Sequence, residues 1–145
     1  MSIGGFFIYM NIFEAKDPIL LPRRATKGSA GYDFIAPDDY VVPAHGTCLI
    51  ESGVSVRLDE DKVLMLYVRS SYGFKHGVTL ANGTGIIDSD FYPNTMKCKL
   101  KNDSDKDLII HKGDHYMQGV IMKWFRADDD AVIKERNGGI GSTGE

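Results

Sequence analysis

The chain has 145 residues and a mass of 16.1 kDa, which is the length of a single domain able to bury its own core. Its 43% hydrophobic and 26% charged residues are ordinary for a globular protein, whereas glycine is enriched at 16 residues. The net charge of −3 argues against stable nucleic-acid binding, because polynucleotide-binding domains are normally basic. A small phosphate ligand remains possible, since it needs only a few well-placed cations.

The first segment to consider is the apolar run from Gly4 to Phe13. It is too short to span a bilayer, which takes about 20 residues. It also lacks the basic residues and the cleavage site of a signal peptide. We therefore expect an N-terminal strand, no membrane association and a cytoplasmic location. Met10 is a second candidate for the translation start, beside Met1.

Further along the chain, short apolar or alternating segments recur, and none has sustained helical periodicity. Residues 63–68 form a continuous apolar run, which predicts a strand covered on both faces. In residues 95–100, alternation places Met96, Cys98 and Leu100 on one face. The remaining strand patterns are residues 48–50, 53–58, 108–110 and 117–125. This spacing predicts one all-β domain, as a sandwich, barrel or jelly roll.

We interpret the cysteines and the histidines as structural residues. Cys48 and Cys98 are 50 positions apart in strand-like segments, and we expect two reduced, buried thiols. The four histidines do not form a metal set. His111 and His115 have the spacing of a helical zinc pair, but a turn at residues 113–114 would separate them.

Arg69, Ser70 and Ser71 directly follow the apolar run at residues 63–68. A strand ending in an arginine and two hydroxyls, then opening a helix, makes a compact anion site. The alternative is a serine that caps a short helix beside a surface arginine.

Asp88 and Asp90 follow an apolar pair and would point to the same side of an extended segment. One of them is a candidate general base for activating water. A turn-forming role, or half of a metal site, is equally compatible with the pattern.

The segment from Arg136 to Glu145 is rich in glycine and nearly devoid of apolar residues. A frayed terminus is one interpretation. The other is a lid that orders on a phosphate ligand, because the Arg136 guanidinium, glycine N–H groups and the hydroxyls of Ser142 and Thr143 all suit phosphate.

Five blocks, taken together and in order, resemble the five motifs of the trimeric dUTPases (deoxyuridine triphosphate nucleotidohydrolases). They are residues 30–34, residues 69–71 with 75–77, residues 85–91, residues 113–118 and residues 136–144. The resemblance covers almost the whole chain from Leu21 onward. It implies a distorted, β-clip-like jelly roll over residues 1–135, with residues 136–145 as a flexible lid. It also implies a homotrimer in which each C-terminal arm crosses to another subunit's site.

The resemblance further implies hydrolysis of dUTP to dUMP and pyrophosphate with Mg²⁺, which keeps uracil out of DNA and supplies dUMP for dTMP synthesis. Asp88 would be the general base and would bond the 3′-hydroxyl, while Asp33 would hold a Mg²⁺-bound water. The substrate contacts implied for the uracil edge are Asn82 and the hairpin backbone through Gly85, Ile87 and Met96, with Phe91 against the deoxyribose. Those implied for the phosphates are Arg69, Ser70, Ser71 and Gln118, with Arg136, Ile140, Gly141, Ser142 and Thr143 in the lid.

The sequence departs from the family pattern at four places. Phe91 replaces a common tyrosine, and residues 92–94 replace a polar-Gly pair, so the hairpin tip must differ. His115 replaces an arginine of a structural ion pair, and Ile140 replaces the phenylalanine that stacks on uracil. These departures leave two alternatives open: a dCTP deaminase-type relative, and a nucleotide-gated regulatory protein with weak catalysis.

Overall fold

A computed structural model describes residues 2–3, 6–7 and 10–136. In this part of the chain short strands dominate, as the alternating patterns predict. The strands are β1 (Ser2–Ile3), β2 (Phe6–Phe7), β3 (Ile12–Ala15), β4 (Tyr32–Ile35), β5 (Tyr40–Val42), β6 (Thr47–Glu51), β7 (Val54–Arg57), β8 (Lys62–Val68), β9 (Val78–Leu80), β10 (Gly85–Ile87), β11 (Lys97–Asn102), β12 (Leu108–Ile110) and β13 (His115–Lys123). The helical elements among these residues are α1 (Ser70–His76) and the 3₁₀ turns η1 (Pro18–Leu20) and η2 (Ser89–Phe91).

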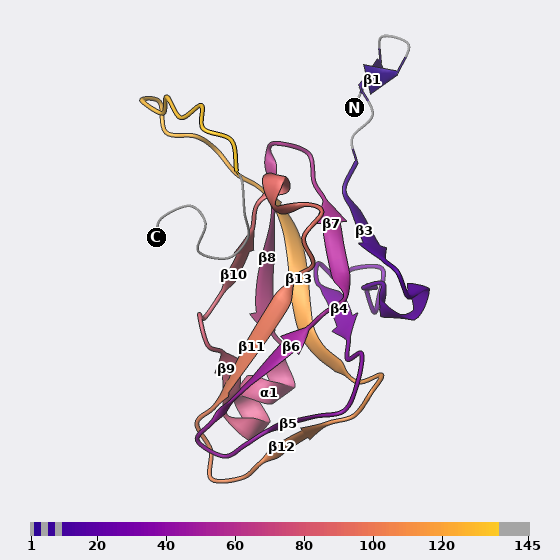
Figure 1. The fold of residues 1–145 in the computed structure, drawn as a ribbon, viewed down its shortest axis with the longest axis vertical. Helices are drawn as coiled ribbons and strands as arrows, with labels where there is room; N and C mark the ends of the chain where they lie inside the picture. The colour runs from indigo at the N-terminus through magenta and orange to yellow at the C-terminus, as the bar shows by residue number, and fades with distance from the viewer. Residues whose placement is uncertain (1, 4–5, 8–9, 137–145) are drawn as a thin grey trace.

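The main sheet has the strand order β10-β8-β13-β4, and every neighbouring pair in it is antiparallel. A three-stranded sheet of order β6-β11-β9 and the pairs β12-β5, β3-β7 and β1-β2 complete the pairing. The long strands β8 and β13 run side by side down the middle of the molecule (Figure 1). The predicted all-β fold is therefore confirmed.

The core lies between these sheets, and it is built from the residues that alternation places inward. Met96, Cys98 and Leu100 are all buried, as predicted. The prediction for residues 63–68 is only half right, because Leu64 and Leu66 are buried whereas Met65 and Tyr67 on the other face are half-buried. A continuous apolar run thus overstates how much of β8 this chain covers by itself.

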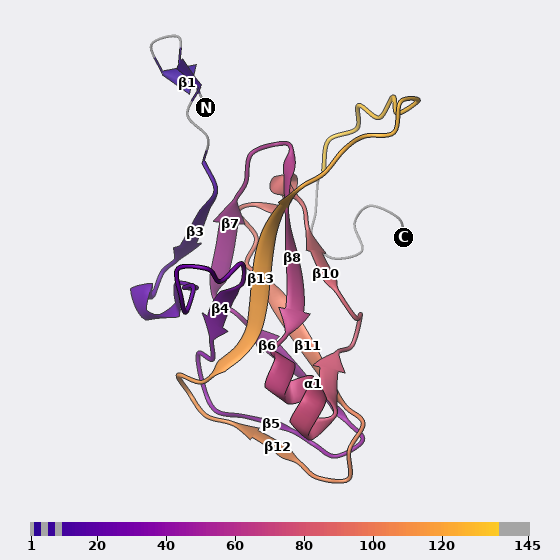
Figure 2. The same cartoon turned by 180° about the vertical axis from the view of Figure 1, so that it is seen from behind.

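Helix α1 begins at Ser70, in agreement with the sequence, but for a different reason. The N-cap is Arg69 in an extended conformation with no side-chain cap, so neither serine has the predicted capping role. The helix ends at Gly77, whose φ of 65° suits a residue without Cβ and whose N–H donates to the Tyr72 carbonyl. This helix lies at the end of the molecule opposite to residues 89–91 (Figure 2).

Two further predictions need correction. Both cysteines are free, but only Cys98 is buried, whereas Cys48 is half-exposed because its end of β6 lies near the sheet margin. The last strand ends at Lys123, and Phe125, expected to close it, is 81% exposed. Within the described ranges, no helix has the length and apolar content needed to cross a membrane.

Candidate active site

The predicted site residues fall into two groups at opposite ends of β8. One group surrounds the junction between β8 and α1, and the other surrounds the turn after β10, the curl seen at the top of Figure 1. Because β10 pairs antiparallel with β8, Ile87 lies opposite Leu64, and Asp88 leaves the sheet at that end. Arg69 lies five residues beyond Leu64, which is about 17 Å along a strand.

The first group is organised by β13, which lies between β8 and β4. Gln118 lies opposite Tyr67 of β8 and Asp33 of β4. Its Nε2 donates to the Val68 carbonyl at 3.2 Å, so the side chain points toward the end of β8 where Arg69 begins. The structure thus brings Gln118 to the strand that leads into Arg69, Ser70 and Ser71.

Gly31 makes room for the Gln118 side chain. A Cβ at position 31 would lie 2.7 Å from Gln118 Oε1, closer than real Cβ contacts allow. The glycine of the first sequence motif is therefore explained by a side chain of the fourth motif, and not by an unusual backbone conformation.

Asp33 sits beside this group with its side chain 15% exposed. His115 Nδ1 lies 3.6 Å from Asp33 Oδ2, so the pair is ionic when the imidazole is protonated. His115 therefore does contact a carboxylate, although as a titratable partner in place of a permanent cation. The Arg69 Nη1 donates at 3.5 Å to the His115 carbonyl, which links Arg69 to the same strand.

The turn between His111 and His115 forms as predicted. Gly113 adopts a φ of 91°, and Asp114 accepts a hydrogen bond from the His111 backbone N–H at 2.8 Å. Among the described residues, no group of three or more His, Cys, Asp or Glu side chains could hold a metal ion by themselves.

The second group centres on Asp88 and Asp90, and both carboxylates lie on the same side. They approach one another because η2 curls the chain after Asp88, and not because the segment is extended as the sequence suggested. Arg136 binds both, with Nη2 2.7 Å from Asp88 Oδ2 and Nε 2.8 Å from Asp90 Oδ1. Its side chain is only 13% exposed, whereas each carboxylate is 53% exposed.

The segments before and after β10 carry the residues expected to contact the nucleoside. Phe91 follows β10 at the Asp88 end, whereas Asn82 precedes it, toward the end of β8 where Arg69 begins. The Asn82 side chain donates to the Thr84 carbonyl at 3.3 Å and shapes a turn in which Gly83 has a φ of 74°. A Cβ on Gly85 would lie 3.0 Å from the Leu66 Cβ, so the glycine lets β10 approach β8 closely. Phe91 is buried at 9% exposure.

Met96, also expected near the uracil edge, is held by its backbone groups. Its N–H donates to the Val54 carbonyl at 2.8 Å, and its own carbonyl accepts from the Ser52 N–H at 3.0 Å. The side chain is fully buried. Met96 is therefore bonded into the fold, and its N–H is not available to read a base edge.

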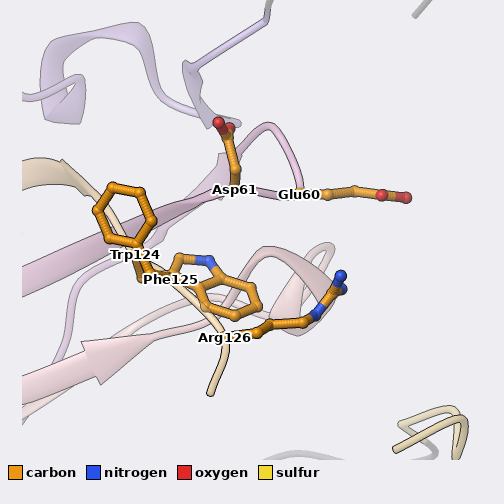
Figure 3. A pocket seen from close by; sticks show the side chains of 5 residues that line it. All are labelled: Glu60, Asp61, Trp124, Phe125 and Arg126. Carbon is orange, nitrogen blue, oxygen red and sulfur yellow. The ribbon is translucent and has the colours of Figure 1, made fainter. Parts of the chain in front are cut away.

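Four residues expected in the lid, Ile140, Gly141, Ser142 and Thr143, lie outside the described residues. A separate surface hollow of about 320 Å³ lies where β13 ends. It is lined by Glu60, Asp61, Trp124, Phe125 and Arg126, none of which belongs to the five motif blocks (Figure 3).

Sequence reasoning missed one contact set near the second group. The Tyr92 hydroxyl binds both Glu14 and Arg57, which are 78 and 35 positions away along the chain. Local patterns carry no signal for such contacts. The only available hint was the departure from the family pattern at residues 92–94.

Comparison with known proteins identifies the same family that the five motif blocks resemble. A family model for dUTPase matches residues 17–144. The deoxyuridine 5′-triphosphate nucleotidohydrolase of Lactococcus lactis is 36% identical over 99% of both chains. That of Paramecium bursaria Chlorella virus 1 is 36% identical over 85% of this chain and 89% of the viral one.

The solved structures that resemble this chain are also dUTPases. The dUTPase of Streptococcus mutans superimposes with a TM-score of 0.74 at 33% identity, covering 80% of this chain and 98% of the other. The dUTPase of phage phi11 of S. aureus, at 21% identity and a TM-score of 0.73, shares the fold. The chain therefore belongs to the dUTPase family.

Proposed function

We propose that the chain hydrolyses dUTP to dUMP and pyrophosphate, and so keeps uracil out of DNA while supplying dUMP for dTMP synthesis. The observation that carries this proposal is the Asp88 carboxylate, half-exposed after β10, beside the buried Phe91 and bonded to Arg136. It combines a base, an apolar wall and a cation that suits phosphate. Family membership supplies the substrate class.

In the proposed mechanism, Asp88 accepts a proton from a water molecule that attacks the α-phosphorus. A new oxygen–phosphorus bond forms, the bond to the bridging α–β oxygen breaks, and pyrophosphate leaves. Such a base needs to lie within hydrogen-bond reach of the water, and the Asp88 carboxylate, which is 53% exposed, is open to that approach. Asp88 would also accept a hydrogen bond from the 3′-hydroxyl.

We assign nucleoside recognition to the turn before β10 and to Phe91. Asn82 and the backbone at Gly85 and Ile87 would read the uracil edge. A site whose fixed donors and acceptors match uracil rejects cytosine, because mismatched groups are left unpaired. Phe91 would lie against the deoxyribose and leave no room for a 2′-hydroxyl.

We assign the α- and β-phosphates to Ser70, Ser71 and Gln118, with Arg69 nearby. Arg136 would exchange its carboxylate partners for the γ-phosphate. Residues 136–145 would then close as the lid of the same domain, with Ile140 and Gly141 over the nucleotide and Ser142 and Thr143 on the phosphate. Closing a lid excludes bulk water and completes the site.

Asp33 would hold a Mg²⁺-bound water. Its carboxylate is a hard oxygen donor, and its side chain is paired only loosely with His115 at 3.6 Å. Mg²⁺ retains waters and prefers phosphate oxygens, so a single carboxylate acting through water fits the residues present. The ion would neutralise charge on the phosphate oxygens.

We further propose that the working unit is a homotrimer with exchanged C-terminal arms. The α-phosphate must lie near the group around Gln118 and within reach of the water that Asp88 activates, yet these two groups lie at opposite ends of β8, about 17 Å apart. A site formed between copies, with one copy's Asp88 facing another copy's Arg69, brings both groups to one ligand.

The test is pyrophosphate release from dUTP, dCTP, dTTP and UTP, each with and without Mg²⁺. We expect release from dUTP only, dependent on Mg²⁺. The Asp88→Asn variant should bind a non-hydrolysable dUTP analogue normally but lose turnover by about a hundredfold or more. Ammonia release from dCTP would replace this proposal with the deaminase, and analogue binding without any turnover would replace it with a regulatory role.

A further inference from the structure

Tyr92 links the candidate active-site turn to two strands that are distant in sequence. Its hydroxyl donates to Glu14 Oε2 at 2.7 Å and accepts from Arg57 Nη2 at 2.8 Å. Arg57 Nε in turn donates to Glu14 Oε1 at 2.8 Å. The three side chains thus form a closed hydrogen-bonded triangle, named here the Tyr92 triangle.

The triangle has a second, independent contact. The Arg57 guanidinium carbon lies 4.4 Å from the centroid of the Tyr92 ring, within the range of a cation–π interaction. The two partners of Tyr92 are themselves fixed, because Glu14 on β3 and Arg57 on β7 belong to paired strands. Tyr92 is therefore held by a pair of strands, and not by another loop.

The protonation states of Glu14 and Tyr92 suit the hydrogen bonds of the Tyr92 triangle. The hydrogen bond from Arg57 holds the pKa of Glu14 below its usual value, and the bond to Glu14 raises the pKa of Tyr92. Glu14 is therefore an ionised acceptor and Tyr92 a neutral donor over a wide pH range. Hydrogen bonds to an ionised acceptor are stronger than those between neutral groups.

The turn that Tyr92 holds carries the chemistry. Tyr92 directly follows η2, so it is one residue from Phe91 and four from Asp88. The other hydrogen bonds within this turn are local: the Phe91 N–H donates to the Asp88 carbonyl, and the Asn94 N–H and Nδ2 donate to the Phe91 carbonyl. Local bonds fix the shape of the turn, and its two ends are held by the pairing of β10 with β8 and by the backbone bonds of Met96. Between these ends, Arg136 binds Asp88 and Asp90, and Tyr92 ties the turn to strands β3 and β7.

We propose that Glu14, Arg57 and Tyr92 are positioning residues that hold Phe91 against the sugar and thereby set the discrimination between deoxyribose and ribose. The inference rests on the proposed function for the identity of the ligand. None of the three side chains need touch the substrate, because their effect passes through the backbone of residues 88–92. A displacement of Phe91 would open space for a 2′-hydroxyl.

The test uses Tyr92→Phe in the full chain, because this change removes the hydroxyl and keeps the ring that Arg57 covers. Tyr40→Phe is the matched control, since Tyr40 lies on β5 at the other end of the molecule (Figure 1). We expect Tyr92→Phe to raise the UTP-to-dUTP ratio of kcat/KM about fivefold, and amide exchange in residues 88–94 to accelerate about tenfold. Tyr40→Phe should change neither.

The partner residues supply a second measurement. Glu14→Gln keeps an acceptor for the Tyr92 hydroxyl and should lose less selectivity than Glu14→Leu, while the double variant Glu14→Leu/Tyr92→Phe should lose no more than Tyr92→Phe alone. Faster exchange with unchanged selectivity would reduce the triangle to a structural role and overturn the inference. Unchanged exchange would overturn it too.

Failure of the proposed function would look different. A wild-type protein that releases no pyrophosphate from dUTP removes the substrate assignment, whereas the exchange rates of residues 88–94 still decide whether the triangle holds the turn.

Discussion

Arg136 bridges Asp88 and Asp90, with its Nη2 2.7 Å from one carboxylate and its Nε 2.8 Å from the other. The guanidinium is nearly covered while the carboxylates are half-exposed. The cation that we assign to the γ-phosphate is thus already paired with the proposed base. A triphosphate has to compete with two carboxylates for it.

Loosening this bridge should favour the nucleotide. Asp90→Asn removes one of the two charges that hold Arg136 and leaves Asp88 in place. Half-exposed ion pairs contribute about 0.5–1 kcal/mol, so we expect KM for dUTP to fall about two- to fivefold with kcat nearly unchanged. Steady-state kinetics at low salt measures this directly.

Asp128→Asn is the matched control, because it removes an exposed carboxylate from the loop before Arg136. Its KM should stay at the wild-type value. An Asp90→Asn variant with a raised KM would mean that Asp90 positions Arg136 for substrate instead of competing with it.

Gly31→Ala tests whether the orientation of Gln118 matters for phosphate binding. The new Cβ would meet Gln118 Oε1 at 2.7 Å, and a flexible side-chain end can move away at little cost to the fold. We expect thermal stability near that of the wild type, and a KM for dUTP raised about five- to tenfold through a loss of about 1 kcal/mol. Gly28→Ala is the control, since a Cβ there meets nothing within 4 Å. Equal KM values for the two variants would remove Gln118 from phosphate binding.

The buried Cys98 thiol predicts a loss of stability at alkaline pH. Burial raises its pKa from 9.0 to about 12. The thiol ionises in the unfolded chain above pH 9 but stays protonated in the folded chain, so this contribution to stability is intact below pH 9 and declines up to pH 12. The decline is about 1.4 kcal/mol per pH unit. Urea unfolding at pH 8 to 11 should show a shallower decline for Cys98→Ala than for the wild type or for Cys48→Ala. Parallel declines for all three would contradict the prediction.

Tyr116→Phe should stabilise the protein. The Tyr116 hydroxyl is buried and has no hydrogen-bond partner among the described residues. An unsatisfied buried hydroxyl costs about 1–3 kcal/mol, so its removal should raise the free energy of unfolding by about 1 kcal/mol. Thermal unfolding measures the change. A lower melting temperature would indicate that a buried water satisfies the hydroxyl in solution.

Much of the fold could be predicted because period-2 patterning records which face of a strand is buried. Met96, Cys98 and Leu100 followed that rule, and the helix after Arg69 began where expected. The boundary of β13 was misjudged because the apolar character continues to Phe125, whereas the strand ends at Lys123 and its last backbone bond runs from the Trp124 N–H to the Asp61 carbonyl. Apolar character alone does not mark the end of a strand, because pairing depends on the partner strand.

The sequence names candidate site residues, but it does not predict how they lie relative to one another. Asp88 and Asp90 bind the same arginine across the turn η2, and the alternation of apolar and polar residues cannot predict such a turn. The Met96 N–H bonds to Val54, a contact across 42 positions that no local pattern reports. Family motifs name residues, but long-range backbone pairing decides which of their groups are free.

The separation of Asp88 from Arg69 along β8 would make the proposed catalysis depend on assembly, and therefore on protein concentration. On the proposed assignments, a single folded chain carries both Asp88 and the phosphate-binding group but cannot bring them to one phosphate. Specific activity should therefore fall on dilution through the dissociation constant of the assembly, while the fold of each chain persists. Substrate that bridges two copies would oppose that loss, so the nucleotide would act as an assembly ligand as well as a reactant.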